Sequence, residues 1–211
     1  MRTTHLLALL VSPLLLTSCI SYAVGTTARP VAPGEFQPSL SAYVVPDGIE
    51  STTSEGSVSD SLAYASADFE GRWGLDSQSD LGLRIPIGGA IVNYKRLING
   101  PNDPARPAVA TIVGAGIVNF GNHAFLEAGL IASGREGRHV PYGGIRAMHV
   151  VPISSGAVSD DPTAGVFGGV RLRVSESFAI SPELGVYYDP SALELRDRNI
   201  IVIPSLTFHW D

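Results

Sequence analysis

The feature that most constrains the fold is an alternation of apolar and polar residues that runs through most of the chain after residue 34. Within residues 168–188, Arg171 and Arg173 alternate with valine and leucine, and Glu183 follows the same spacing among apolar neighbours. Because successive side chains of a β-strand point to opposite faces, this period indicates strands with one apolar and one polar face. No comparable helical period occurs in this part of the sequence. The chain is therefore expected to fold as an all-β domain.

Turn-forming residues divide the alternating pattern into ten segments, which we take as candidate strands. The segments are 35–45, 62–73, 80–86, 89–98, 107–117, 123–133, 141–151, 164–174, 178–188 and 199–210. The division at Gly88-Gly89 decides the count, because without it there are nine strands. We predict a single antiparallel up-and-down β-barrel of 8–10 strands. Ten strands are preferred, because an even number returns the C-terminus to the side where the first strand begins.

The polar faces of these strands carry acids and bases in nearly equal numbers. The charged residues are Asp68, Glu70, Arg72, Asp80, Arg84, Lys95, Glu127, Arg146, Arg171, Arg173 and Glu183. A soluble sheet would turn such a face to water, where the signs need not balance, and this remains the alternative. A barrel in a membrane must keep the charges inside, because unpaired charge away from water is costly. Apolar-out, polar-in alternation is typical of outer-membrane barrels. We therefore expect these side chains to form a paired network in the lumen, with Arg171, Arg173 and Glu183 among the pairs and no sizeable pore.

Aromatic residues fall near both ends of the predicted strands. Tyr43 and Tyr187 belong to the group at one end, and Trp73, Tyr142 and Trp210 belong to the group at the other. Amphipathic rings favour the two interfaces of a membrane, so these groups predict two aromatic belts. Connections on one side of the barrel are mostly longer than those on the other, which also recurs in membrane barrels.

The N-terminus has the features of a secretion signal. One arginine is followed by an apolar run from Leu6 to Leu16 and then by small residues. This run is too short to span a membrane as a helix. The sequence Leu16-Thr17-Ser18-Cys19 resembles the lipobox of bacterial lipoproteins. That resemblance implies cleavage after Ser18, several acyl chains such as palmitate on Cys19, and an anchor in the bacterial outer membrane. An ordinary signal peptide with an unrelated cysteine is the alternative.

The chain is thus expected to have three parts. Residues 1–18 are the predicted lipoprotein signal peptide, and residues 35–211 are the predicted barrel. Residues 19–34 lack periodicity and contain two prolines and two glycines, which predicts a lipidated tether between the membrane anchor and the barrel.

The last part of the chain resembles known membrane barrels. Residues 164–210 are similar to the final three strands of small bacterial outer-membrane β-barrel proteins, and they end on Phe208-His209-Trp210. Such barrels commonly end on an aromatic residue, whereas Asp211 follows the tryptophan here. The resemblance implies a cell-envelope protein located in the outer membrane.

No motif in the sequence points to a particular chemistry. His123, His139, His149 and His209 do not form the spacings of a zinc site. No serine–histidine–acid arrangement is recognisable, so no catalytic residue, metal or cofactor is predicted. The formal net charge of −6 offers no basic surface for nucleic acid. The expected partner is outer-membrane lipid, and no protein partner is indicated.

The sequence therefore predicts an outer-membrane β-barrel lipoprotein with a structural or interaction role, and two alternatives stay open. The Gly-Arg-Trp sequence at residues 71–73 resembles the Gly-x-Trp signature that lipocalins carry on their first strand. This resemblance would make the protein a soluble lipid-binding barrel with an apolar interior. Prolines at positions 38, 182 and 204 lie in three strands that become neighbours on closure. Proline interrupts strand pairing, so these residues predict bulges in the wall. Because the three prolines are expected at similar depth, the alternative is a lateral passage for lipid in a lipid-modifying enzyme.

Overall fold

A computed structural model describes residues 21–52, 58–154, 161–189 and 200–210 of the protein. The strands are β1 (Phe36–Thr52), β2 (Val58–Asp76), β3 (Ser79–Pro86), β4 (Ala90–Leu97), β5 (Ala108–Val118), β6 (His123–Ser133), β7 (His139–Pro152), β8 (Thr163–Ser175), β9 (Phe178–Tyr188) and β10 (Ile200–Trp210), with a 3₁₀ turn η2 (Asn119–Gly121) between β5 and β6. No helix in these ranges is long and apolar enough to cross a membrane.

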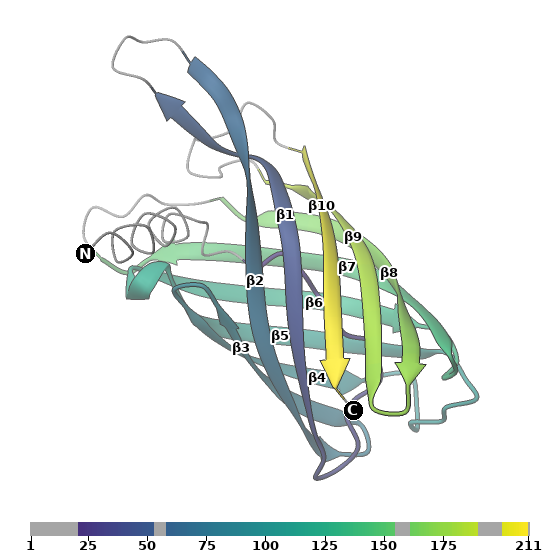
Figure 1. The fold of residues 1–211 in the computed structure, drawn as a ribbon. Coiled ribbons are helices and arrows are strands. Elements are labelled where there is room, and N and C mark those ends of the chain that lie inside the picture. The colour runs from purple at the N-terminus through teal and green to yellow at the C-terminus, as the bar shows by residue number, and fades with distance from the viewer. Residues whose placement is uncertain (1–20, 53–57, 155–160, 190–199, 211) are drawn as a thin grey trace, which may run out of the picture.

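The ten strands form one closed barrel in which each strand is antiparallel to the strand before it (Figure 1). Closure is completed by β1, which pairs with β10 from Ser39–His209 to Tyr43–Ser205. The turn between β3 and β4 falls where the sequence divides, since Gly88 adopts a φ of 76° and the N–H of Gly89 bonds to the carbonyl of Pro86 at 3.2 Å. The prediction of a single antiparallel barrel with ten strands is confirmed.

The barrel is apolar outside and polar inside. Each strand turns at least one large apolar side chain outward, among them Val113 on β5, Leu126 on β6 and Ile145 on β7, each about half exposed. Charged side chains such as Arg84 and Lys95 lie inside and are 2% and 1% exposed. This distribution is the reverse of that in a soluble protein and is the one found in outer-membrane barrels.

The predicted aromatic belts are only partly present on the outside of the barrel. Trp73 and Trp210 face outward near the same end, as predicted. Tyr43, Tyr142 and Tyr187 instead face the lumen and are almost fully buried. The alternation places them there, because each tyrosine shares its strand face with the polar positions.

The two ends of the barrel differ in their connections. We call the end with the tight β2–β3 and β8–β9 turns and the C-terminus the short-turn end. The other end carries the β7–β8 and β9–β10 connections, and we call it the long-loop end. The rule has exceptions, because the segment between β4 and β5 at the short-turn end is long, and the β3–β4 and β5–β6 connections at the long-loop end are short. The hairpin of β1 and β2 extends well beyond its neighbours at the long-loop end (Figure 1).

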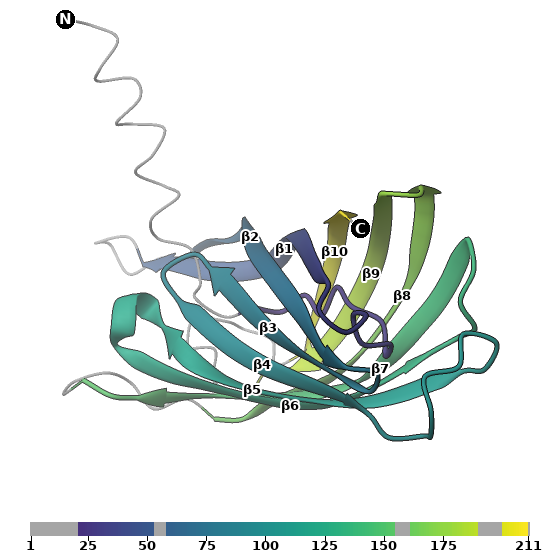
Figure 2. The same ribbon diagram turned by 90° about the horizontal axis from the view of Figure 1, so that it is seen from below.

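Residues 21–34, which we call the N-terminal segment, run through the inside of the barrel, and residues 32–34 are exposed at the short-turn end. Figure 2 shows this segment in dark purple within the ring of strands. Residues 21–30 are all buried, and the segment is not in a helix or strand. The sequence predicts a tether for this stretch, and its described part occupies the lumen. Residues 1–20, including Cys19, lie outside the described residues, so the signal peptide and lipidation remain predictions.

Candidate functional site: the filled lumen

A cluster of charged side chains crosses the middle of the lumen on β2, β3 and β4. Arg72 donates to Glu70 at 2.6 Å and to Asp80. Arg84 donates to the second oxygen of Glu70 at 3.1 Å, and Asn93 donates to Glu70 at 2.9 Å. The pairs form because these residues alternate along adjacent strands whose register sets Glu70 opposite Arg84.

A second group of charges lies across the lumen on β6 and β7. Arg146 forms an ion pair with Glu127 through Nε and Nη2. The guanidinium of Arg84 lies 3.9 Å from the same carboxylate and so connects the two groups. Buried charges are tolerated where they are paired and hydrogen-bonded, as they are here.

The structure places the eleven predicted lumen charges in two settings. Nine are buried inside the barrel: Asp68, Glu70, Arg72, Asp80, Arg84, Lys95, Glu127, Arg146 and Glu183. Arg171 is half-buried and Arg173 is exposed, and both lie at the short-turn end. The carboxylate of Glu183 accepts hydrogen bonds from the N–H groups of Val24 and Gly25 and from the Tyr142 hydroxyl.

The backbone of the N-terminal segment supplies many partners of the lumen charges. Lys95 donates to the carbonyls of Thr27 at 3.0 Å and Arg29 at 2.8 Å. The guanidinium of Arg146 donates to the carbonyls of Ser21 and Tyr22 at 2.8 and 3.0 Å. A segment outside any sheet needs partners for its buried N–H and C=O groups. The charged side chains of the wall provide these partners, and the backbone of the segment in turn satisfies the wall charges.

Gly25 allows the segment to fit closely against the wall. Its φ is 60°, a conformation that favours glycine. A Cβ at this position would lie 2.5 Å from the Oγ1 atom of Thr207 and 2.9 Å from the Oγ atom of Ser41. Thr207 and Ser41 are themselves within 2.8 Å of each other, joining β10 to β1. The segment therefore packs directly on the strands that close the barrel.

An apolar cluster fills the lumen toward the long-loop end. The ring of Tyr22 lies 5.5 Å from that of Tyr187 and 6.4 Å from that of Tyr43, measured between centroids. Val45 and Ile203 belong to the same buried cluster. The lumen is thus charged in its middle and apolar toward the long loops, and a second buried apolar cluster that includes Leu97 and Ile131 lies on the short-turn side.

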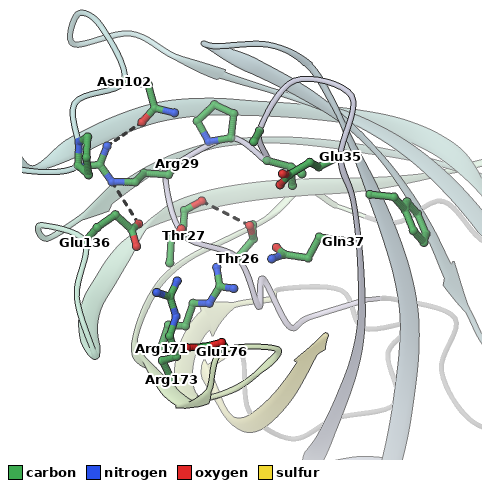
Figure 3. A pocket seen from close by; sticks show the side chains of 15 residues that line it. Thr26, Thr27, Arg29, Glu35, Gln37, Asn102, Glu136, Arg171, Arg173 and Glu176 are labelled. Atoms are coloured by element: carbon green, nitrogen blue, oxygen red, sulfur yellow. Dashed lines mark hydrogen bonds and ion pairs between the residues drawn. The ribbon is translucent and has the colours of Figure 1, made fainter. Parts of the chain in front are cut away.

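A pocket of about 440 Å³ opens at the short-turn end, between the N-terminal segment and β8. Arg29 forms one side, paired with Glu136 at 3.2 Å and bonded to Asn102 at 2.7 Å. Arg171 and Arg173 form the other side, and Figure 3 shows their guanidinium groups pointing toward the N-terminal segment. Acidic side chains also line the pocket, so its charge is mixed.

One serine–histidine contact lies in the lumen wall. The Oγ atom of Ser181 on β9 is 2.9 Å from Nε2 of His209 on β10. Both side chains are almost completely buried, at 1% and 3% exposure. The contact therefore joins two strands and offers a substrate no approach. Within the described ranges, no three His, Cys, Asp or Glu side chains are grouped as metal ligands.

The prolines of β1, β9 and β10 do not lie at one depth, so that prediction is wrong. Pro182 is opposite Leu206, and Leu206 is opposite Ala42, whereas Pro38 lies nearer the start of β1. Pro204 lies beyond Leu206 toward the long-loop end. The stagger of strands in a closed barrel causes this spread. The β9–β10 register also continues past Pro182 and Pro204 without a shift.

Comparison with known proteins gives likenesses in fold only. No protein-family model matches the chain, and no curated protein matches it in sequence. Among solved structures, Neisserial surface protein A is 12% identical with a TM-score of 0.39, and the match covers 83% of this chain and 95% of that one. Outer membrane protein OprG from Pseudomonas aeruginosa is 12% identical with a TM-score of 0.33, covering 88% and 98%. The attachment invasion locus protein Ail of Yersinia pestis is 12% identical with a TM-score of 0.31, covering 83% and 97%.

Proposed function

We propose that the protein is an outer-membrane lipoprotein whose barrel is closed by its own N-terminal segment and whose role is structural or in interactions at the cell envelope. In this proposal Cys19 carries the lipid, the short-turn end faces the periplasm and the long-loop end faces outward, as is usual for such barrels. The partner is outer-membrane lipid around the wall. No catalytic step is assigned to any residue.

One observation carries the proposal: the charges of the lumen are satisfied by the chain itself. Lys95 and Arg146 donate to backbone carbonyls of the N-terminal segment. Glu183 and Asp80 accept from its backbone N–H groups, the latter from Val31 at 2.9 Å. A water-filled channel would leave these charges solvated. Their satisfaction by protein groups supports a filled lumen rather than a pore.

The same interior fits poorly with a lipocalin-like carrier. Such a carrier needs an apolar cavity for its ligand, whereas the middle of this lumen holds paired charges. In the Gly-Arg-Trp sequence, Arg72 belongs to the charge cluster and Trp73 lies on the outside, 43% exposed. The sequence match to lipocalins therefore does not correspond to a tryptophan beneath a ligand cavity.

Single-channel recording of the acylated protein in planar bilayers tests the closed lumen. We expect no large, steady conductance. A variant in which Lys95, Arg146 and Glu183 are all replaced by alanine would loosen the N-terminal segment and is expected to show intermittent openings. A large, steady conductance from the unaltered protein would contradict the proposal.

A further inference from the structure

The N-terminal segment runs along the lumen from one half of the barrel to the other. Where it joins β1, Gly34 donates its N–H to the carbonyl of Gly74 at 2.9 Å, at the short-turn end. At its beginning, the Ser21 hydroxyl donates to Asp68, which is six residues from Gly74 along β2. Six residues of strand cover about 20 Å. The hydroxyl of Tyr22 donates at 2.7 Å to Asp189, directly after the end of β9 at the long-loop end.

The position of Ser21 limits where a lipid on Cys19 can emerge. Two residues of extended chain span only about 7 Å. A lipid on Cys19 would therefore be attached within about 7 Å of Ser21 when the N-terminal segment is in place. An acyl chain directed back toward the short-turn end would have to pass the buried ion pairs of Arg84 and Arg146. An apolar chain that separates such pairs is strongly disfavoured.

The ladder of hydrogen bonds between β1 and β10 ends close to Tyr22, where the wall is apolar. Among the described residues, the hydrogen-bonded pairs of β1 and β10 end at Tyr43–Ser205. The next residue of β10 is Pro204, which has no N–H to continue the ladder. From there to Ile200, β10 has pairing partners in β9 and none in the described part of β1. Figure 1 shows β1 and β10 diverging toward the long-loop end.

The side chains along this unpaired stretch of β1 and β10 are apolar on both faces. Val45 and Ile203 point inward and are 0% and 2% exposed, in the same cluster as Tyr22. Val44 and Val202 point outward and are 42% and 43% exposed. Acyl chains that pass between β1 and β10 thus meet apolar side chains inside the wall, at its edge and outside it.

We propose that the acylated N-terminus leaves the lumen in the long-loop half and that its acyl chains pass between β1 and β10 into the outer half of the membrane. This inference rests on the proposed lipidation of Cys19. The occupant of this unpaired stretch is the chain's own lipid, because Tyr22, close to the start of the described chain, lies in the same buried cluster as Val45 and Ile203. The lipid then anchors the chain on the side of the membrane opposite to the start of β1. The N-terminal segment connects the two sides through the lumen.

Photo-crosslinking from the outer wall tests this route in the full-length protein made in cells. Benzoylphenylalanine replaces Val44 or Val202 beside the unpaired stretch of β1 and β10, and in matched controls it replaces Phe36 or Trp210 at the short-turn end. All four side chains face outward and are between 42% and 46% exposed, so the fold should tolerate each change. Val44 and Phe36 are eight residues apart on β1, or about 26 Å of strand. Alkyne-labelled palmitate supplied to the cells identifies the acylated N-terminal peptide.

The expected result is that the labelled N-terminal peptide is joined to the β1 or β10 peptide after irradiation of the Val44 and Val202 variants, at least fivefold more often than in the Phe36 and Trp210 variants. Crosslinks mainly from Phe36 or Trp210, or an acylated Cys19 that is joined to none of the four sites, would overturn the route. Absence of palmitate from Cys19 would overturn the proposed lipoprotein function itself, and mass spectrometry of the N-terminal peptide separates the two failures.

Discussion

Replacing Lys95 by methionine tests the coupling between the wall and the N-terminal segment. The ammonium group lies 3.2 Å from Asp80 and donates to Thr26, Thr27 and Arg29 at 2.9, 3.0 and 2.8 Å. Three hydrogen bonds from a charged donor contribute about 1.5–3 kcal/mol each. The burial of the ammonium group offsets several kcal/mol of this sum. We therefore expect K95M to lower the free energy of unfolding by about 3–5 kcal/mol.

The assay is urea unfolding of the protein in detergent micelles, followed by the fluorescence of Trp73 and Trp210. R96M is the matched control, because Arg96 is the next residue of β4 and points outward. We expect its midpoint to equal that of the unaltered protein. If the K95M midpoint coincided with that of R96M, Lys95 would not couple the segment to the wall, and the argument for a filled lumen would be refuted.

Three further substitutions test other parts of the structure. G25V should destabilise the protein by about 1–3 kcal/mol through overpacking against Thr207. Its control is G137V, because the space around a Cβ at position 137 is open. G137V should change the free energy of unfolding by less than about 0.5 kcal/mol in the same urea titration. Y22F removes the hydrogen bond to Asp189 and should cost about 1–3 kcal/mol; an unchanged midpoint would contradict that contact. V113R places a charge on the outside of β5 and should cost about 2–4 kcal/mol in lipid vesicles, while equal stability of V113R would argue against a lipid-facing wall.

The strands could be predicted from the sequence because apolar and polar residues alternate along each of them. On β6 and β9 the alternation begins and ends with the strand, and the predicted ranges 123–133 and 178–188 agree with the structure. On β1 the predicted end at residue 45 is too early, since the strand continues to Thr52. The register of β1 and β2 shifts beyond Val45, which disrupts the alternation on which the prediction depends.

The faces of the charged residues were also predictable, whereas their partners were not. A period of two places Glu70 and Arg72 on one face whatever the barrel geometry. Which base meets which acid depends on the stagger of neighbouring strands, and this follows from barrel closure. The prediction that Pro38 and Pro204 lie at similar depth is wrong for the same reason, because it did not include the stagger of the strands.

The position of the N-terminal segment could not be obtained from periodicity. A chain enclosed on all sides has no exposed face, so its sequence need not alternate. One signal was present, because Arg29 is the only charged residue among residues 20–34. A tether in water is usually richer in polar and charged residues. The uncharged stretch around Tyr22 and Val24 is consistent with burial in the lumen.

The central claim, that the barrel itself spans the outer membrane, is tested by removing the lipid. Cys19→Ala, made behind a signal peptide that is cleaved without lipidation, leaves the barrel as the sole attachment to the membrane. We expect this variant to fractionate with the outer membrane and to resist extraction by carbonate and urea. Recovery of a folded C19A protein from the soluble periplasmic fraction would contradict the account, because the apolar outer wall would then have to face water.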